Sequence, residues 1–305
     1  MNNDPSIIPA YYRTAIWCLR ITTALQCLGI AGRYLLATFE TESPAYGLLF
    51  FNFGIPEYAA QFIDDLGVYG CLLASGSIIL TGILYDVSKQ LLSDQSINRL
   101  RSLDNVTLAF IVLWTLSMAI AETIRGDLFS RFTLLEEAVR IASPLALLLF
   151  LMTNRLAIGS RSHKWASIIL LFATSTTFAI HGYKAIELYG PFVDFLLLSK
   201  PFGITIASNQ QTAEAFLFVI GWVDIILAIS IVVLRWQGIA LYMAAWGFLT
   251  AFSRITAGGL DAWPELLIRS ANAGAPLTLF FLLRGKSLCG FTKNNIRQKT
   301  NLTER

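Results

Sequence analysis

Charged residues are scarce in this chain, because Asp, Glu, Lys and Arg together make up only 14% of its 305 residues. Soluble globular domains carry about 25%. Hydrophobic residues fill the difference at 55%, and the mean hydropathy is +0.60. This composition excludes an ordinary water-soluble domain and predicts a polytopic membrane protein. With a formal net charge of only +3, the chain also offers no basic surface for nucleic acid.

Histidine and cysteine are also rare. His163 and His181 are the only histidines, so haem ligation by paired histidines would be hard to build. The four cysteines form no CxxC pair, and three lie in apolar segments, where a thiol usually acts as a small hydrophobe. The chain lacks a phosphate-binding glycine loop, an HExxH sequence and a dinucleotide-binding fingerprint. We therefore expect no metal site, and whether the chain is an enzyme stays open.

Long apolar runs dominate the remaining sequence. A membrane-spanning helix needs about 20 predominantly apolar residues. The segments that meet this need are residues 14–38, 66–86, 105–123, 132–152, 165–187, 213–235, 238–257 and 266–284. The sequence therefore predicts an all-α integral membrane protein with eight transmembrane helices. The N-terminus has no cleavable signal pattern, so we expect the first helix to be retained.

The basic residues of the short loops predict the orientation. Lys and Arg occur between the second and third segments, between the fourth and fifth, and in the tail 285–305. The loop between the first two segments has no base and carries the acids Glu40, Glu42, Glu57, Asp64 and Asp65. The positive-inside rule therefore predicts a multi-pass protein of the inner or plasma membrane with both termini in the cytoplasm.

The second half of the chain repeats the first. A shift of 132 positions places Trp114 on Trp246, Gly126 on Gly258 and Pro144 on Pro276. An even number of helices in each half gives both halves the same orientation, so we predict two parallel four-helix repeats around a pseudo-two-fold axis. The predicted parts are a cytoplasmic N-terminus (1–13), the first repeat (14–152), a cytoplasmic linker (153–164), the second repeat (165–284) and a basic cytoplasmic tail (285–305).

Three connecting segments stand out. The stretch 86–105 spaces its leucines and isoleucines as a short interfacial helix would. The apolar outer loops 47–62 and 189–204 are too short to span the bilayer. They lie at the outer interface or fold back over the bundle, and whether they act as lids stays open.

Ionisable groups within apolar segments are costly in a membrane and are therefore candidate functional groups. His181, Lys184 and Glu187 are spaced three apart and share one helical face. Asp224 lies near the middle of its segment, where it must be neutral, hydrated or paired. The candidate ligand-binding residues are His181, Lys184, Glu187, Glu214, Trp222, Asp224, Trp246, Arg254 and Arg269. The alternative is that the polar groups satisfy helix–helix hydrogen bonds and the tryptophans pack or form an interfacial belt.

The repeat reverses the sign of charge at two positions. Glu122 aligns with Arg254, and Glu137 aligns with Arg269. About a pseudo-two-fold axis, such reversed charges could meet across the interface between the halves. The alternative is that each charge extends separately to the headgroup region.

The second half, residues 165–284, resembles the DoxX-like family. The resemblance rests on Gly182-Tyr183-Lys184 at the end of one span, a following loop with Pro and Phe, Glu214 at the start of the next span, and Gly258 and Pro276 in the last pair. It covers residues 14–152 weakly, where Arg33 replaces the lysine. The family unit is a four-span bundle, so the resemblance implies a tandem double.

Members of that family are associated with membrane redox systems, such as a quinone-reducing thiosulfate oxidoreductase. The resemblance therefore implies a subunit that holds a quinone or lipid-like molecule, with His181, Lys184 and Glu214 as polar contacts, and a redox-enzyme partner that supplies electrons. Two alternatives stay open. One is a small-molecule or proton-coupled transporter built from parallel repeats. The other is a non-catalytic membrane scaffold or stability protein that holds no ligand. In each case the lipid bilayer is an expected partner.

Overall fold

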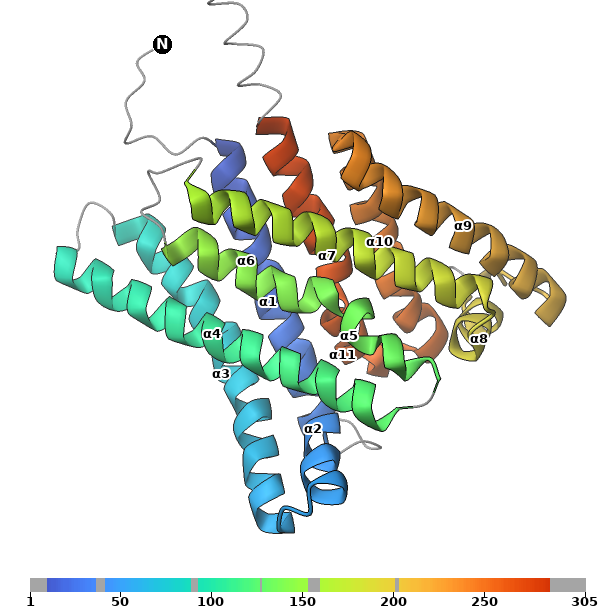
Figure 1. The fold of residues 1–305 in the computed structure, drawn as a ribbon, viewed down its shortest axis with the longest axis horizontal. Helices are drawn as coiled ribbons and strands as arrows, with labels where there is room; N and C mark the ends of the chain where they lie inside the picture. The colour runs from blue at the N-terminus through green and yellow to red at the C-terminus, as the bar shows by residue number, and fades with distance from the viewer. Residues whose placement is uncertain are drawn as a thin grey trace, which may run out of the picture.

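The computed structural model describes residues 10–36, 42–88, 93–126, 128–152, 160–200 and 203–285, and its regular structure in these ranges is entirely helical. By length and composition, six helices could cross a membrane. They are α1 (Ala10–Leu36), α3 (Glu57–Ser88), α4 (Asp94–Arg125), α7 (Arg161–Ile186), α9 (Gln210–Leu234) and α10 (Gln237–Gly258). The all-α architecture of a membrane protein predicted from the sequence is therefore present (Figure 1).

The two remaining predicted spans are broken helices. The last one consists of Leu260–Ile268 and Ser270–Gly285, which meet at an angle of 45° and count as a seventh span if taken together. The segment predicted at 132–152 divides into α5 (Thr133–Glu136) and α6 (Ala138–Met152). With 15 residues, α6 is about 22 Å long, which is less than the roughly 30 Å of a bilayer core. Six or seven helices thus meet the length of a span, and the eighth stays a prediction.

The same order of elements occurs twice along the chain. In the first half, α1 is followed by the short α2 (Pro44–Gly47), then by α3, α4, a 3-10 turn, α5 and α6. In the second half, α7 is followed by the short α8 (Gly190–Leu198), then by α9, α10, a 3-10 turn, α11 (Trp263–Ile268) and the helix Ser270–Gly285. The break after α5 falls at Glu137 and the break after α11 at Arg269, with φ near −89° and −86°.

The two halves pack into each other rather than side by side. The helix α1 contacts α3 of its own half and α11 of the other, while α7 contacts α9 of its own half and α6 of the other (Figure 1). The Tyr12 hydroxyl and His163 Nε2 lie 2.7 Å apart, although these residues are 151 positions apart in the sequence. The main hydrophobic core runs through both halves and includes Leu19, Ile78, Leu108, Phe150, Leu170 and Met243. A smaller apolar cluster lies around α8 and the start of α9.

Two sequence predictions about connecting segments are corrected or refined. Within the stretch 86–105, residues 94–105 form the first turns of the long helix α4 rather than a short helix of their own, and the Ser93 side chain accepts a hydrogen bond from the Ser96 N–H at its start. Residues 86–88 end α3, and residues 89–92 lie outside the described residues. The loop 47–62 contains a π-helical turn (Leu48–Asn52) and the start of α3, and the loop 189–204 contains α8. The short helices α5, α8 and α11 lie at the end of the bundle opposite the start of α1, which we call the short-helix end (Figure 1).

Small residues allow a close crossing of α7 and α9. A Cβ added at Gly182 of α7 would lie 2.6 Å from the Gly221 carbonyl oxygen of α9, and the converse distance is also 2.6 Å. Only glycine allows two helix backbones to approach this closely. The crossing lies near the C-terminal end of α7 and thereby fixes the position of the polar residues His181 and Lys184.

Candidate functional site

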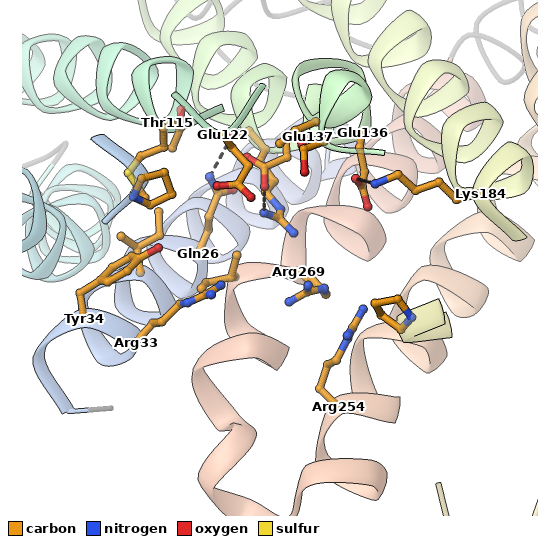
Figure 2. Close-up of a pocket in the computed structure, with 18 of the residues that line it drawn as sticks. Gln26, Arg33, Tyr34, Thr115, Glu122, Glu136, Glu137, Lys184, Arg254 and Arg269 are labelled. Carbon is orange, nitrogen blue, oxygen red and sulfur yellow. Dashed lines mark hydrogen bonds and ion pairs between the residues drawn. The ribbon is translucent and has the colours of Figure 1, made fainter. Parts of the chain in front are cut away.

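Two cavities adjoin one another near the short-helix end. The first has a volume of about 300 Å³ and is lined mainly by charged and polar side chains, so we call it the charged chamber (Figure 2). The second has a volume of about 360 Å³ and is lined mainly by apolar and aromatic side chains, so we call it the apolar cavity. Phe192, Arg254 and Arg269 line both. The two cavities therefore meet at a pair of arginines.

Both halves of the chain contribute to the charged chamber. The helices α1, α4, α5 and α6 of the first half and α7, α10 and α11 of the second all face it. Its bases are Arg33, Arg140, Lys184, Arg254 and Arg269, and its acids are Glu122, Glu136 and Glu137. These five bases and three acids belong to six segments that are far apart in the sequence. They come together only because the two halves pack against each other.

Among the described residues, ion pairs of Lys184 and of Arg33 connect the two halves. Lys184 Nζ of α7 lies 2.5 Å from Glu136 Oε2 of α5, and Arg33 Nη1 of α1 lies 2.8 Å from Glu265 Oε1 of α11. Each pair joins the first long helix of one half to the short helix of the other. Glu136 also lies 3.3 Å from Nε2 of His181. The Lys184 side chain is only 3% exposed, so its pairing with Glu136 compensates a charge that water cannot reach.

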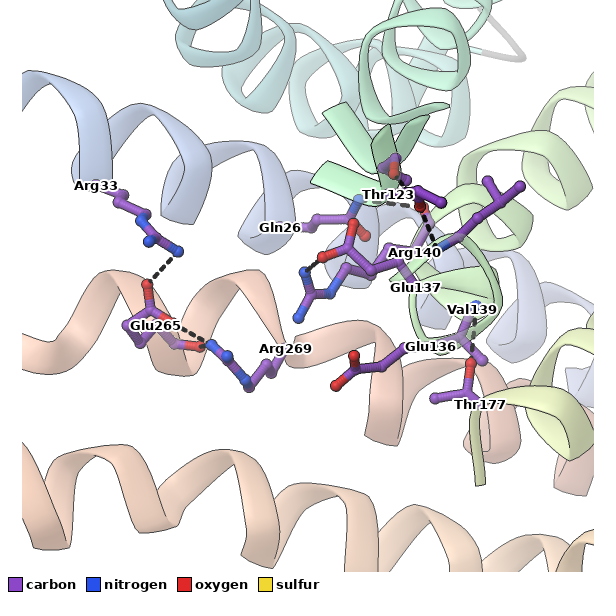
Figure 3. Close-up of polar contacts among 12 residues, drawn as sticks. Gln26, Arg33, Thr123, Glu136, Glu137, Val139, Arg140, Thr177, Glu265 and Arg269 are labelled. Carbon is purple, nitrogen blue, oxygen red and sulfur yellow. Dashed lines mark hydrogen bonds and ion pairs between the residues drawn. The ribbon is translucent and has the colours of Figure 1, made fainter. Parts of the chain in front are cut away.

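The two charge reversals of the repeat do not form the predicted pairs. Glu137 pairs with Arg140, and Arg269 pairs with Glu265, so both contacts stay within one half (Figure 3). Among the described residues, no ion pair within 4 Å joins Glu122 to Arg254. Arg33 and Lys184 make the cross-half pairs instead, because they end the first long helix of each half and point toward the other half's short helix.

Arg254 has an unusual environment. Its guanidinium carbon lies 3.5 Å from the centroid of the Phe195 ring, a cation–π contact. Its Nε is buried without a hydrogen-bond partner. Figure 2 shows Arg254 and Arg269 extending toward the same part of the chamber. Two guanidinium groups that face one cavity repel each other unless an anion lies between them.

The apolar cavity has aromatic walls and a few polar groups. Phe178, Phe195, Phe216 and Trp246 form much of its lining. The polar groups include His181, Asp224 and Asn272. Asp224 is 5% exposed, and its Oδ1 is buried without a hydrogen-bond partner. Among the described residues, Asp224 forms no ion pair within 4 Å, so this carboxyl oxygen lacks a partner in mainly apolar surroundings and could hydrogen-bond a ligand.

The structure brings together six of the nine residues singled out from the sequence. His181, Lys184, Asp224, Trp246, Arg254 and Arg269 line one or both cavities. The other three lie apart from the linings. Glu187 is exposed at the end of α7, Glu214 accepts a hydrogen bond from Gln210 on its own helix, and Trp222 is 49% exposed beside Phe218.

The candidate list from the sequence missed the first half's contribution. Glu136 and Arg140 are central to the chamber, and the Gln26 side chain donates to the Arg140 carbonyl oxygen at 3.1 Å. The adjacent carboxylates Glu136 and Glu137 within a predicted span were a usable signal, since intramembrane acids are rare.

The described residues contain no cluster of three or more His, Cys, Asp or Glu side chains that could hold a metal ion. Comparison of this chain with family models, curated proteins and solved structures finds no match in any of the three. The site is therefore interpreted from its own geometry.

Proposed function

We propose that this chain is an integral membrane protein that binds a lipid-like molecule in the two adjoining cavities. The observation that carries the proposal is the junction of an apolar cavity of about 360 Å³ with a charged chamber of about 300 Å³. Ligand sites typically combine a mostly apolar wall with a few placed polar groups at this size. A molecule with a polar head and an apolar body matches both parts.

The resemblance to the DoxX-like family favours one version of this function. In that version the protein is an accessory subunit of a membrane redox system. An isoprenoid quinone would place its ring among the aromatic residues of the apolar cavity, where His181 and Asp224 could hydrogen-bond its oxygens. Glu214 departs from the implied contacts, because it lies outside both linings. Electrons would come from a partner protein, since a quinone needs a donor.

The duplicated order of elements supports the finer architecture that we propose, two parallel four-helix repeats. In this arrangement α5 with α6 would form the fourth crossing segment and α11 with Ser270–Gly285 the eighth. The start of α1 and the end of the last helix lie close together, because a Cβ added at Gly285 would contact the Tyr11 ring. We place this end in the cytoplasm of an inner or plasma membrane by the distribution of Lys and Arg.

The test is mass spectrometry of an organic extract from purified protein, compared between Ser253→Phe and Ser117→Phe. Ser253 lines the apolar cavity, so a phenyl ring there would occupy the ligand's space. Ser117 is exposed on α4, so the same substitution there is the matched control. We expect a stoichiometric quinone or lipid in the wild type and the control, and its loss from Ser253→Phe. The same bulk phospholipid in all three samples would contradict the proposal.

A small-molecule transporter is the second candidate, favoured by the position of the chamber between the halves. Parallel-repeat transporters bind their substrates at such an interface. Proton-coupled uptake by reconstituted vesicles that Ser253→Phe abolishes would favour transport. Binding without uptake would favour the accessory subunit.

A further inference from the structure

We infer that the cavities bind an amphipathic anion, a molecule with a carboxylate or phosphate head on an apolar chain. Arg254 and Arg269 would hold the head where the cavities meet, and the chain would extend along the apolar cavity. This inference rests on the proposed function and adds the chemical class of the head group. Both arginines line both cavities, so a head between them leaves its chain free to enter the apolar side.

One base of the chamber, Arg254, takes part in none of the ion pairs that the described residues form. Lys184 has Glu136 as its partner, and Arg140 has Glu137. Glu265 pairs with both Arg33 and Arg269. Among the described residues, Arg254 has no carboxylate within 4 Å and rests on the Phe195 ring instead.

The charged side chains that line the chamber also include more bases than acids. The five bases of the chamber face its three acids, and the outlying Glu265 makes a fourth. Glu122 is already included among those acids, and among the described residues it makes no ion pair with Arg254. Arg254 and Arg269 are only partly exposed, and a cation that has lost part of its hydration is costly without a counterion. A single anionic head would supply that counterion, which a neutral quinone carbonyl would not.

The geometry of the arginines suits an anion. A guanidinium offers planar, paired N–H donors that match a carboxylate or a phosphate. The buried Nε of Arg254 is a donor without an acceptor. On the other side, Phe195, Phe216 and Trp246 provide the apolar surface that an alkyl chain needs. Asp224 also lines the apolar cavity, but it lies near the middle of α9, whereas Arg254 lies close to the end of α10. Asp224 therefore does not act as the counterion of Arg254.

The test is binding of radiolabelled palmitate, hexadecyl phosphate and hexadecanol to the full chain in phosphatidylcholine nanodiscs. The three probes share one chain and differ in head group. We expect at least one of the two anions to bind about tenfold or more tighter than hexadecanol, as a charge-assisted hydrogen bond predicts. The tighter of palmitate and hexadecyl phosphate identifies the head. Arg254→Gln should lower the affinity for that anion by about tenfold and leave hexadecanol unchanged.

Arg131→Gln is the control, because Arg131 is an exposed base outside both linings. The wild-type comparison of head groups tests the inference even if Arg254→Gln does not fold. Equal affinities of the wild type for the three probes would overturn the anionic head. In that case, hexadecanol could still compete with the molecule that is extracted from the wild type but not from Ser253→Phe. This result would support the proposed lipid binding without the anionic head. If Ser253→Phe changes neither extract nor binding, both proposals fail.

Discussion

At the scale of single residues, Arg20 shows how a charge is retained inside the bundle. It is 1% exposed, and its guanidinium donates to the Ile78 carbonyl oxygen at 2.6 Å and to both carboxylate oxygens of Asp104, the closer at 2.6 Å. The Thr81 hydroxyl donates to Asp104 at 2.5 Å. This network joins α1, α3 and α4. Its main effect is that each buried charge neutralises the other, so that neither is left buried without a counterion.

Asp104→Ala should therefore destabilise the protein strongly. It leaves the Arg20 guanidinium buried without a counterion, which typically costs about 3–5 kcal/mol. Thermal unfolding in detergent is the measurement. Arg13→Ala is the control, since Arg13 pairs with Asp86 at 3.1 Å but is 61% exposed, and such pairs contribute about 0–1 kcal/mol. Equal losses of stability in both variants would contradict the network's role.

Glu136→Gln should weaken the contact between the halves. Glu136 is the partner of the buried Lys184 and also lies within 3.3 Å of His181, so the neutral amide leaves the lysine uncompensated. We expect a loss of about 1–3 kcal/mol, measured by thermal unfolding. Glu187→Gln removes an exposed carboxylate of the adjoining turn and should change the stability little. A similar effect of the two changes would show that the pair carries no stability.

At the scale of helices, the duplicated breaks are informative. The helical hydrogen-bond ladder is interrupted at Glu137 and at Arg269, and the chain then resumes with Arg140 N–H donating to the Glu137 carbonyl and Asn272 N–H donating to the Arg269 carbonyl. Both breaks place a charged side chain at the chamber. The offset of 132 positions predicted this equivalence, whereas the break itself has no proline or glycine signal at either residue.

Gly182→Leu should disrupt the crossing of α7 and α9. The added Cβ would lie 2.6 Å from the Gly221 carbonyl oxygen, so the helices must separate. We expect the free energy of unfolding to fall by about 1–3 kcal/mol, measured by thermal unfolding. We also expect weaker ligand binding, because His181 and Lys184 move with α7. Gly76→Leu in α3 is the matched control, since a Cβ there meets nothing within 4 Å. Equal tolerance of both substitutions would exclude a tight crossing.

At the scale of the whole molecule, the orientation can be tested by labelling single cysteines in a cysteine-free background. Leu128 and Leu260 are exposed at the short-helix end, and Lys164 and Trp236 are exposed at the opposite end. In intact cells, an impermeant maleimide should label Leu128→Cys and Leu260→Cys but reach Lys164→Cys and Trp236→Cys only after lysis. The reverse pattern would invert the predicted orientation.

The sequence by itself determined the all-helical architecture with helices long and apolar enough to cross a membrane. It also predicted the repeat, with which the doubled order of elements is consistent. Apolar runs of about 20 residues predict helices, because backbone groups in lipid must be hydrogen-bonded and a helix of this length achieves that within a single segment. It also singled out Arg254, Arg269, His181 and Lys184, because charge inside an apolar run is costly and therefore visible. Helix ends such as Ser88 and Asp94 escaped prediction, because the polar stretch between them reads equally well as an interfacial helix.

Only the tertiary structure decided which charges meet. Glu214 and Arg254 look alike along the chain, yet one bonds to its own helix and the other faces the chamber. The hypothesis that Glu122 meets Arg254 was reasonable from the repeat but wrong, because pairing depends on the rotation of each helix and on side-chain reach. The interlocking of α1 with α11 and of α7 with α6 sets those rotations. Sequence spacing fixes the face of a residue within one helix, and packing alone fixes what that face meets.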